Sequence, residues 1–360
     1  SKISTGGNEF SIALKPDGTL WSTGLNDYGE LGIGSNVNKS SFTQIGLATN
    51  WHTFSAGGLH TLALKTDGTL WSWGGNSEGQ LGNNTMVDSN LPIQIGVATN
   101  WAIVSAGGYY FSAAIKTDGT LWTWGNDSFG ELGNGTVLGQ QLVPTQIGID
   151  TNWKTVSAGQ YHSLALKTDG SLWAWGSNSY GALGDGTTTT RPAPIQIGSA
   201  TDWDTIVAGS FASYAIKTDG TLWSWGYNQY GQLGNGTTVN TPVPTQIGSD
   251  TNWKEVSSKF GYYAIALKTD GSAWSWGLNM AGYLGDGTRT QRLSPVPITC
   301  PAALGTEDFA KQTVSLYPNP SNGVFTISST ENLKKITAFD VLGKEILVKT
   351  IANNQFSIEQ

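Results

Sequence analysis

One ten-residue phrase is written six times along this chain at nearly constant spacing. It reads KTDGTLWSWG at positions 65–74 and returns in close variants. Its lysine stands at Lys15, Lys65, Lys116, Lys167, Lys217 and Lys268, which gives a period of 50 or 51 residues. A fixed period of this length is typical of repeat folds, in which each unit is one small supersecondary assembly.

Each unit contains four short strand patterns. In the unit that starts at Trp153 they are NWKTVSAG, YHSLALK, SLWAWG and IQIG. The middle two are joined by TDG, where Asp tolerates the turn geometry and Gly supplies a positive φ. No helical periodicity competes with the alternation of apolar and polar residues. The sequence therefore predicts an all-β fold, a β-propeller of six four-stranded blades, with a seventh blade left open.

Two further recurring features belong to the predicted scaffold. Tryptophans spaced by two, such as Trp173 and Trp175, face one side of a strand and are expected to pack between blades. Stacking of a sugar or base on them is the alternative. The loop pattern WG-x-N-x-x-G-x-L-G places an Asn, such as Asn178, where it can bond to its own loop. Asp185 and Asp286 lie close by in sequence, but no calcium-loop motif accompanies them, so no metal is predicted.

Composition and charge exclude several classes of function. The net charge is −7 and the longest basic run is Lys334-Lys335, which argues against nucleic-acid binding. No apolar stretch is long enough to predict a transmembrane segment. The single cysteine, Cys300, has no adjacent base, and the three histidines have no metal-binding spacing. We expect no catalytic residues, no cofactor and no enzymatic activity.

Binding is expected where the units differ from one another. One variable position precedes a loop glycine, and aromatic residues on exposed loops are typical binding anchors. The candidates on this loop face are Tyr28, Phe129, Tyr180 and Tyr230, with Arg289 and Arg292 in neighbouring loops. A second variable position lies five residues before each repeat lysine, and it is predicted to surround one mouth of the central channel. The candidates there are Phe10, His60, Phe111, His162 and Tyr263. For both sets, ordinary packing within the propeller is the alternative.

The units resemble a known family of repeats. The pattern VSAG-xx-HSLALK-TDG-xLWxWG-xNxxGxLGxGT, over residues 1–298, is similar to the repeats of the regulator of chromosome condensation family. The resemblance implies a β-propeller, usually seven-bladed, that serves as a platform for protein partners. Some members are guanine-nucleotide exchange factors. Exchange depends on a wedge inserted in one blade, which the even spacing leaves no room for, and the basic chromatin-binding tail is absent.

The two ends of the repeat region leave the closure of the ring open. The first unit lacks a Trp-containing opening strand, and the last stops at SPVPIT, where another such strand would begin. Either the two ends pair to close six blades, or a seventh blade precedes residue 1. We expect the chain to be a piece of a longer protein at both ends.

The C-terminal residues follow a different pattern. A linker is predicted at 299–313, and residues 314–360 alternate like the strands of a small, partial β-sandwich. The motifs YPNPSNG and DVLGKE resemble the C-terminal sorting domain of the type IX secretion system of Bacteroidetes. The resemblance implies contact with the type IX machinery and a secreted or outer-membrane-surface location. An appended binding domain is the alternative.

Together these features predict a secreted or cell-surface propeller that binds a protein partner through one loop face. The alternatives are a carbohydrate-binding adhesin that recognises a surface glycan and a secreted polysaccharide-active enzyme. A guanine-nucleotide exchange factor is the least favoured interpretation.

Overall fold

The computed structural model describes residues 2–108, 110–258 and 262–298, together with four strands nearer the C-terminus. The chain divides into two compact units, Ser1–Ile298 and Thr299–Gln360. Every regular element of the described residues is a β-strand. No membrane-spanning helix is found in this described part of the chain.

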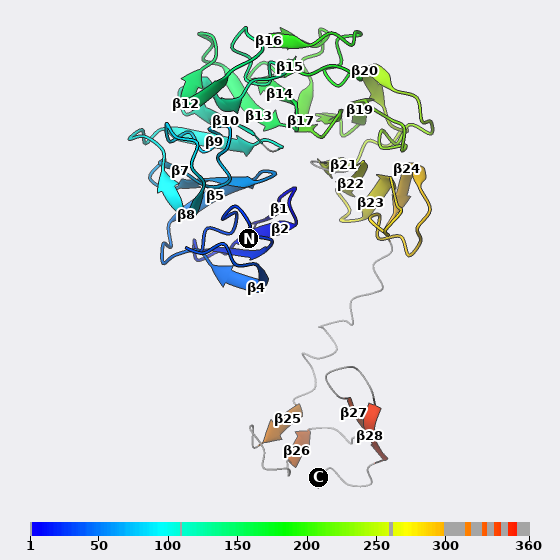
Figure 1. The fold of residues 1–360 in the computed structure, drawn as a ribbon. Helices are drawn as coiled ribbons and strands as arrows, with labels where there is room; N and C mark the ends of the chain where they lie inside the picture. Colours follow the sequence, from blue (N-terminus) through cyan, green and yellow to red (C-terminus); the bar gives the residue numbers. More distant parts are fainter. Residues whose placement is uncertain are drawn as a thin grey trace. The chain divides into compact units, whose positions relative to one another are not determined.

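The first unit is a β-propeller of six four-stranded antiparallel blades, arranged in sequence order around a ring (Figure 1). The innermost strands, which contact their counterparts in neighbouring blades, are β1 (Lys2–Thr5), β5 (Trp51–Ala56), β9 (Trp101–Ala106), β13 (Trp153–Ala158), β17 (Trp203–Ala208) and β21 (Trp253–Ser257). The second strands are β2 (Phe10–Leu14), β6 (His60–Lys65), β10 (Phe111–Lys116), β14 (His162–Lys167), β18 (Ala212–Lys217) and β22 (Tyr263–Lys268).

The remaining two strands of each blade lie farther out. The third strands are β3 (Leu20–Gly24), β7 (Leu70–Gly74), β11 (Leu121–Asn126), β15 (Leu172–Gly176), β19 (Leu222–Gly226) and β23 (Ala273–Gly277). The outermost are β4 (Lys39–Gln44), β8 (Ser89–Gln94), β12 (Gln140–Gln146), β16 (Arg191–Gln196), β20 (Thr241–Gln246) and β24 (Arg292–Pro297). The predicted fold class, all-β with six four-stranded blades, is confirmed.

The repeated TDG turn fixes the hairpin between the second and third strands. In the fourth blade, Asp169 accepts hydrogen bonds from the backbone N–H of Ser171 at 2.9 Å and from its hydroxyl at 2.6 Å. The same hydroxyl accepts the indole N–H of Trp173 at 2.9 Å. Gly170 has a φ of +79°, which favours glycine. The turn thus orients the first tryptophan of each pair as well as reversing the chain.

The second tryptophan of each pair joins one blade to the preceding one. Trp175 is completely buried, and its indole N–H donates to the carbonyl of Glu131 in the third blade at 2.8 Å. Gly133 in that blade has a φ of +75°, and a Cβ there would lie 2.8 Å from the indole. The same bond recurs for Trp73, Trp124, Trp225 and Trp276. The predicted packing role of this tryptophan is confirmed.

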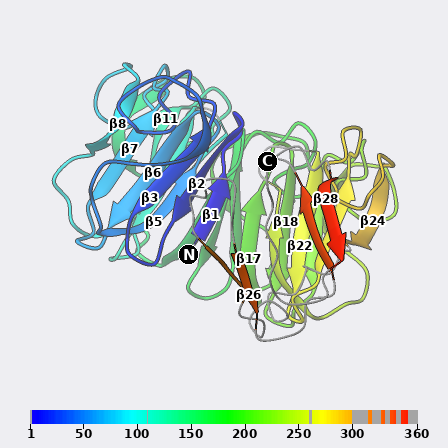
Figure 2. The same ribbon diagram turned by 90° about the horizontal axis from the view of Figure 1, so that it is seen from below.

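Each blade is built from consecutive strands of the chain. In the first blade β1 pairs with β2, and β2 with β3; Figure 2 shows these three side by side. In the sixth blade β24 pairs with β23, and β21 with β22. Of the two alternatives for the ends of the repeat region, the one in which they pair with each other is therefore not found among the described residues. The strand Lys2–Thr5 fills the inner position of the first blade without a tryptophan.

The second unit contains four described strands. The strands β25 (Val314–Tyr317) and β26 (Thr326–Ser329) pair antiparallel, as do β27 (Lys335–Phe339) and β28 (Glu345–Thr350). These two hairpins fall within the segment predicted as a partial β-sandwich. The predicted linker, 299–313, lies outside the described residues.

Candidate interaction surface

Two loops of every blade meet on one face of the propeller. One connects the first and second strands, and the other connects the third and fourth. In the fourth blade the backbone N–H of Ser177 donates to the carbonyl of Tyr161 at 2.8 Å, and in the fifth blade Tyr227 donates to Phe211 at 2.9 Å. Because this bond recurs in all six blades, the residues that differ between units are held at equivalent places on one face.

In the third to sixth blades this face carries a continuous row of seven aromatic rings. We call it the aromatic strip; its members are Phe129, Tyr161, Tyr180, Phe211, Tyr227, Tyr230 and Tyr262. Each of the loops after a third strand reaches the next blade. Thus Phe129 contacts Tyr161 with ring centroids 5.3 Å apart, and Tyr180 contacts Phe211 at the same distance. The strip therefore crosses three successive blade boundaries.

The rings of the strip are half-buried and support one another. Tyr180 contacts both Phe211 and Tyr227, and its side chain remains 39% exposed. Polar groups in the same loops hold the hydroxyls. The amide of Gln160 donates to the Tyr161 hydroxyl at 3.0 Å, and the Tyr227 hydroxyl donates to Gln229. Edge-to-face contacts of this kind restrict the rings without covering them.

A buried carboxyl supports one end of the strip. The carboxylate of Glu131 accepts the backbone N–H of Phe129 at 2.6 Å, and its residue is only 2% exposed. Burial raises the pKa of the Glu131 carboxyl to about 7. At the equivalent place in the fifth blade, the neutral amide of Gln232 accepts the N–H of Tyr230 at 2.9 Å. The side-chain oxygens of Glu131 and Gln232 thus accept equivalent backbone hydrogen bonds from their loops.

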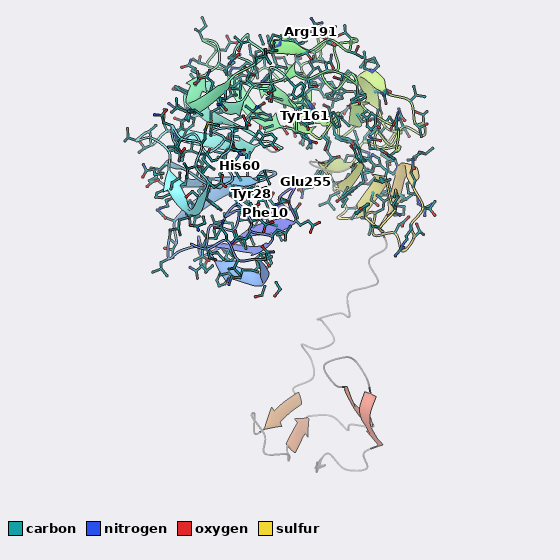
Figure 3. All side chains as sticks on the ribbon, viewed as in Figure 1. Phe10, Tyr28, His60, Tyr161, Arg191 and Glu255 are labelled. Carbon is teal, nitrogen blue, oxygen red and sulfur yellow. The ribbon has the colours of Figure 1, made fainter. Side chains whose placement is uncertain are left out.

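The predicted loop-face aromatics divide into two groups. Phe129, Tyr180 and Tyr230 are members of the strip. Tyr28 is also exposed, but it lies on the first blade, away from the strip, beside Gly75 of the second blade. Figure 3 labels Tyr28 near the first blade and Tyr161 on the opposite side of the ring's centre.

The two predicted arginines differ in availability. Arg292 makes an ion pair with Asp286, with 2.7 Å between Nη2 and Oδ2, so its charge is neutralised within its own loop. Arg191 of the fourth blade makes the same pair with Asp185 and lies at the outer edge of the ring in Figure 3. Arg289 is exposed. A role of Arg292 in attracting an acidic partner is therefore not supported.

The predicted channel-mouth set lies mostly inside the propeller. The exposed fractions of Phe10, His60, Phe111 and His162 are at most 1%. This burial agrees with the alternative that these residues pack within the propeller. Only Tyr263 is partly exposed, stacked on Tyr283 at 5.4 Å. The four buried residues are therefore not candidates for contact with a partner.

One of these buried histidines has a defined hydrogen-bond role. The Ser213 hydroxyl donates to the carbonyl of Ala182 at 2.7 Å, so it accepts the Nε2–H of His162, which lies 2.8 Å away. Burial lowers the pKa of the His162 imidazole to about 4. The histidine is therefore a neutral connector between the fourth and fifth blades.

Sequence reasoning missed four members of the strip, namely Tyr161, Phe211, Tyr227 and Tyr262. Three of them stand one residue before the predicted channel-mouth position, where the six units read Glu9, Leu59, Tyr110, Tyr161, Phe211 and Tyr262. A comparison of this neighbouring position between units would have shown aromatic residues gathered in the later blades. At this position Tyr161 and Phe211 are partly exposed, whereas the next residues, His162 and Ala212, are buried.

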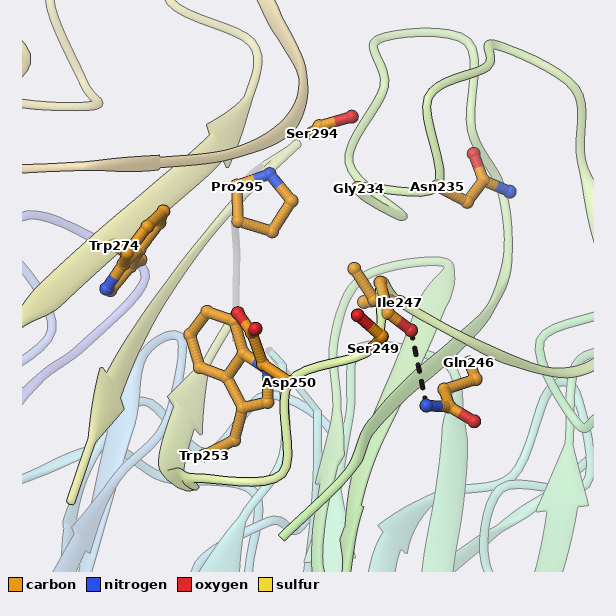
Figure 4. Close-up of a pocket in the computed structure, with 11 residues that line it drawn as sticks. Gly234, Asn235, Gln246, Ile247, Ser249, Asp250, Trp253, Trp274, Ser294 and Pro295 are labelled. Carbon is orange, nitrogen blue, oxygen red and sulfur yellow. Dashed lines mark hydrogen bonds between the residues drawn. The ribbon is translucent and has the colours of Figure 1, made fainter.

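A cavity between the fifth and sixth blades contains no cluster of catalytic or metal-binding side chains. It has a volume of about 450 Å³ and is lined by Asp250, Trp253 and Trp274 among others (Figure 4). The amide of Gln246 donates to the carbonyl of Gly248 there at 3.2 Å. No group of three or more His, Cys, Asp or Glu suited to a metal occurs among the described residues. Asp185 and Asp286, the considered calcium ligands, are instead paired with arginines.

Known proteins resemble both units. A model of the RCC1-like domain matches residues 1–316, and a model of the secretion system C-terminal sorting domain matches residues 315–360. The RCC1 domain-containing protein RUG3, mitochondrial, of Arabidopsis thaliana is 38% identical over 78 residues, which is 21% of this chain and 17% of the relative. The X-linked retinitis pigmentosa GTPase regulator homolog of Caenorhabditis elegans is 40% identical over 76 residues, which is 20% of this chain and 5% of the relative. These segments span less than a fifth of either relative.

Solved structures show the same fold. Human WBSCR16 superposes with a TM-score of 0.73 at 24% identity, covering 83% of this chain and 82% of that one. Prp20p from Saccharomyces cerevisiae superposes with a TM-score of 0.74 at 21% identity, covering 87% and 78%. The sorting domain marks the protein for export to the extracellular or outer-membrane surface. From the family match over residues 1–316 and the propeller formed by the first unit, the chain belongs to the RCC1-like domain family.

Proposed function

We propose that the protein is an exported interaction module whose propeller binds a protein partner through the aromatic strip. The observation that carries the proposal is the unbroken contact of seven rings across four blades on one face. The yeast relative Prp20p, which has this fold, was described with its binding to Gsp1p and histones. A propeller of this fold can thus bind proteins.

The composition of the strip supports a protein partner. Tyrosine and phenylalanine rings alternate with uncharged polar residues, among them Gln160, Ser177, Ser210 and Gln229. Tyrosine combined with small polar residues is characteristic of protein-binding loops, because the ring supplies a large contact area at a low cost in conformational entropy. The rings are already fixed by their neighbours, so little further freedom is lost on binding.

The strip is less suited to a sugar chain. Sugars stack on the open faces of aromatic rings, whereas several neighbouring rings of the strip meet edge to face. The planes of Phe129 and Tyr161, for example, are 74° apart. Capture of a glycan in place of a protein would indicate a carbohydrate-binding adhesin. Hydrolysis of a captured polysaccharide would indicate a polysaccharide-active enzyme.

The test compares matched variants of the full chain. Immobilised parent protein is exposed to culture medium and cell-surface extract, and retained molecules are identified. The strip variant carries Ala at Tyr180, Phe211 and Tyr227. The control variant carries Ala at Tyr28 and Leu59, the loop residues of the first two blades. Melting temperatures verify that all three proteins are folded.

The proposal predicts a protein that is retained by parent and control and lost by the strip variant. The retained protein, once purified, should bind the parent in a 1:1 complex in solution. Equal retention by all three proteins, or retention of a polysaccharide alone, would contradict the proposal.

A further inference from the structure

Among the described residues, no joining tryptophan links the first and sixth blades, unlike the other five pairs of neighbouring blades. At the place of the joining tryptophan, the first blade has Thr23, whose hydroxyl donates to the carbonyl of Lys39 within its own blade at 2.8 Å. In the sixth blade, the position of Gly285 is approached by Ile298 instead of an indole. A groove of about 640 Å³ opens between these two blades. We call it the end groove.

The end groove is continuous with the aromatic strip. Tyr262, the last ring of the strip, lines the groove and contacts Tyr230 with centroids 5.0 Å apart. Two further tyrosines line the same wall, Tyr263 and Tyr283, which stack with an angle of 1° between their planes. A partner that covers the strip is therefore led directly into a groove walled on one side by tyrosine rings.

The opposite wall supplies a single charge. Glu9 of the first blade lines the groove and is the only charged residue among its described lining. Its side chain is exposed, and among the described residues no hydrogen bond or ion pair engages its carboxylate. A carboxylate and tyrosine rings that line the same groove can each attract a cation.

Glu9 is also the only charged residue at its position in the six repeat units. The equivalent residues of the other five blades are Leu59, Tyr110, Tyr161, Phe211 and Tyr262. Glu9 has a φ of +53°, which is uncommon for a residue other than glycine. Its loop is fixed to the second blade, because Gly7 and Asn8 donate backbone hydrogen bonds to Gly57 and Gly58. The charge is thus held in place where the groove opens.

We propose that the end groove binds an arginine or lysine side chain of the protein that covers the strip. Arginine fits best, because its planar guanidinium can stack on a tyrosine ring and pair with the Glu9 carboxylate. This inference rests on the proposed function, since it assigns one feature of the same partner.

The test measures discrimination between a charged and a neutral side chain. The probes are the capped tripeptides Tyr-Leu-Arg and Tyr-Leu-citrulline, which differ in charge and hardly in shape. Dissociation constants for the full chain are measured by calorimetry at low salt. The parent should prefer the arginine peptide about fivefold, as expected for one exposed ion pair with a cation–π contact. The Glu9→Gln variant should bind both peptides equally.

Matched variants make the outcomes decisive. Glu78→Gln removes another carboxylate from the loop face and should leave the preference intact. Tyr230→Ala should weaken the binding of both peptides by the same factor. No preference in the parent, no binding of either peptide at 10 mM (roughly the weakest affinity of a small ligand), or a preference that survives Glu9→Gln would overturn the inference.

The two proposals can fail separately. If the protein captured by the strip binds parent and Glu9→Gln equally well, the groove inference falls and the proposed function stands. If the peptides discriminate as expected but no protein is captured, the proposed function falls.

Discussion

The first two blades and the last four share one scaffold but differ on the loop face. Trp73 joins the second blade to the first by the same bond that Trp175 makes between the fourth and the third. At the variable loop positions, however, the second blade has Leu59, Gly75 and Glu78, whereas the later blades have mostly aromatic residues. The second blade thus has the same strands and joining bond without aromatic residues at these positions. The scaffold therefore does not require the strip.

The largest expected effect tests whether the scaffold is indeed equal in both halves. Trp73→Ala and Trp175→Ala should each lower the free energy of unfolding by roughly 3–5 kcal/mol, because each removes a fully buried indole. Trp173→Ala should cost less, since its ring is partly exposed. Denaturant titrations followed by circular dichroism measure all three. A large cost for only one of the two buried tryptophans would mean that the halves are built differently.

A second prediction uses pH to test the buried carboxyl of Glu131, which supports one end of the strip. Glu131 has a pKa of about 7 in the folded protein, well above that of an exposed glutamate. Between about pH 4.5 and 7 the unfolded chain loses this proton while the folded chain keeps it, so stability falls as pH rises and levels off above 7. The full decrease is about 3 kcal/mol. Glu131→Gln should abolish it and keep the bond to Phe129, as Gln232 does for Tyr230.

The measurement must be a difference between variants, because His162 acts in the opposite direction. Its pKa of about 4 means that the folded protein binds fewer protons than the unfolded chain between about pH 4 and 6.5, so stability rises with pH there. The two slopes partly cancel in the parent. Subtracting the Glu131→Gln curve isolates the glutamate, and parallel curves for the two proteins would show that this carboxyl is not buried as described.

A third prediction places binding energy in one half only. Phe211→Ala should weaken binding of the captured partner by roughly 2 kcal/mol, the usual cost of removing a central aromatic contact. Leu59→Ala, at the equivalent position of the second blade, should leave the affinity unchanged. Calorimetry with the purified partner measures both. Equal losses would indicate that the partner surrounds the whole face instead of following the strip.

The sequence predicts the scaffold far better than the surface. A period of 50 or 51 residues, the Asp-Gly turns and the paired tryptophans suffice for six four-stranded blades, because each feature acts locally or between neighbours. They do not tell that Trp175 is fully buried and Trp173 is not, since both face the same side of one strand. Only the placement of the adjacent blade separates them.

The site was only half predictable for a similar reason. Phe129, Tyr180 and Tyr230 were found because they occupy a loop position that varies between units. Tyr161 and Phe211 stand directly before a strand, where alternation alone does not say which neighbour faces outward. The end groove could not be predicted at all, because Glu9 and Tyr283 line the same groove only through the curvature of the whole ring.

The smallest predicted effect tests whether the strip is rigid. In a double-mutant cycle, Tyr161→Ala and Phe211→Ala should show a coupling of about 1 kcal/mol in the free energy of unfolding, because their rings stack at 5.3 Å. The control cycle with Tyr28 and Leu59 should show almost none, since no ring pair forms there. A rigid strip costs little entropy when it binds, which is the physical reason for expecting tight recognition from so few residues. If the coupling of Tyr161 and Phe211 were no larger than that of the control pair, the rings would move independently. The strip would then resemble the first two blades in behaviour, and its aromatic content alone would have to account for binding.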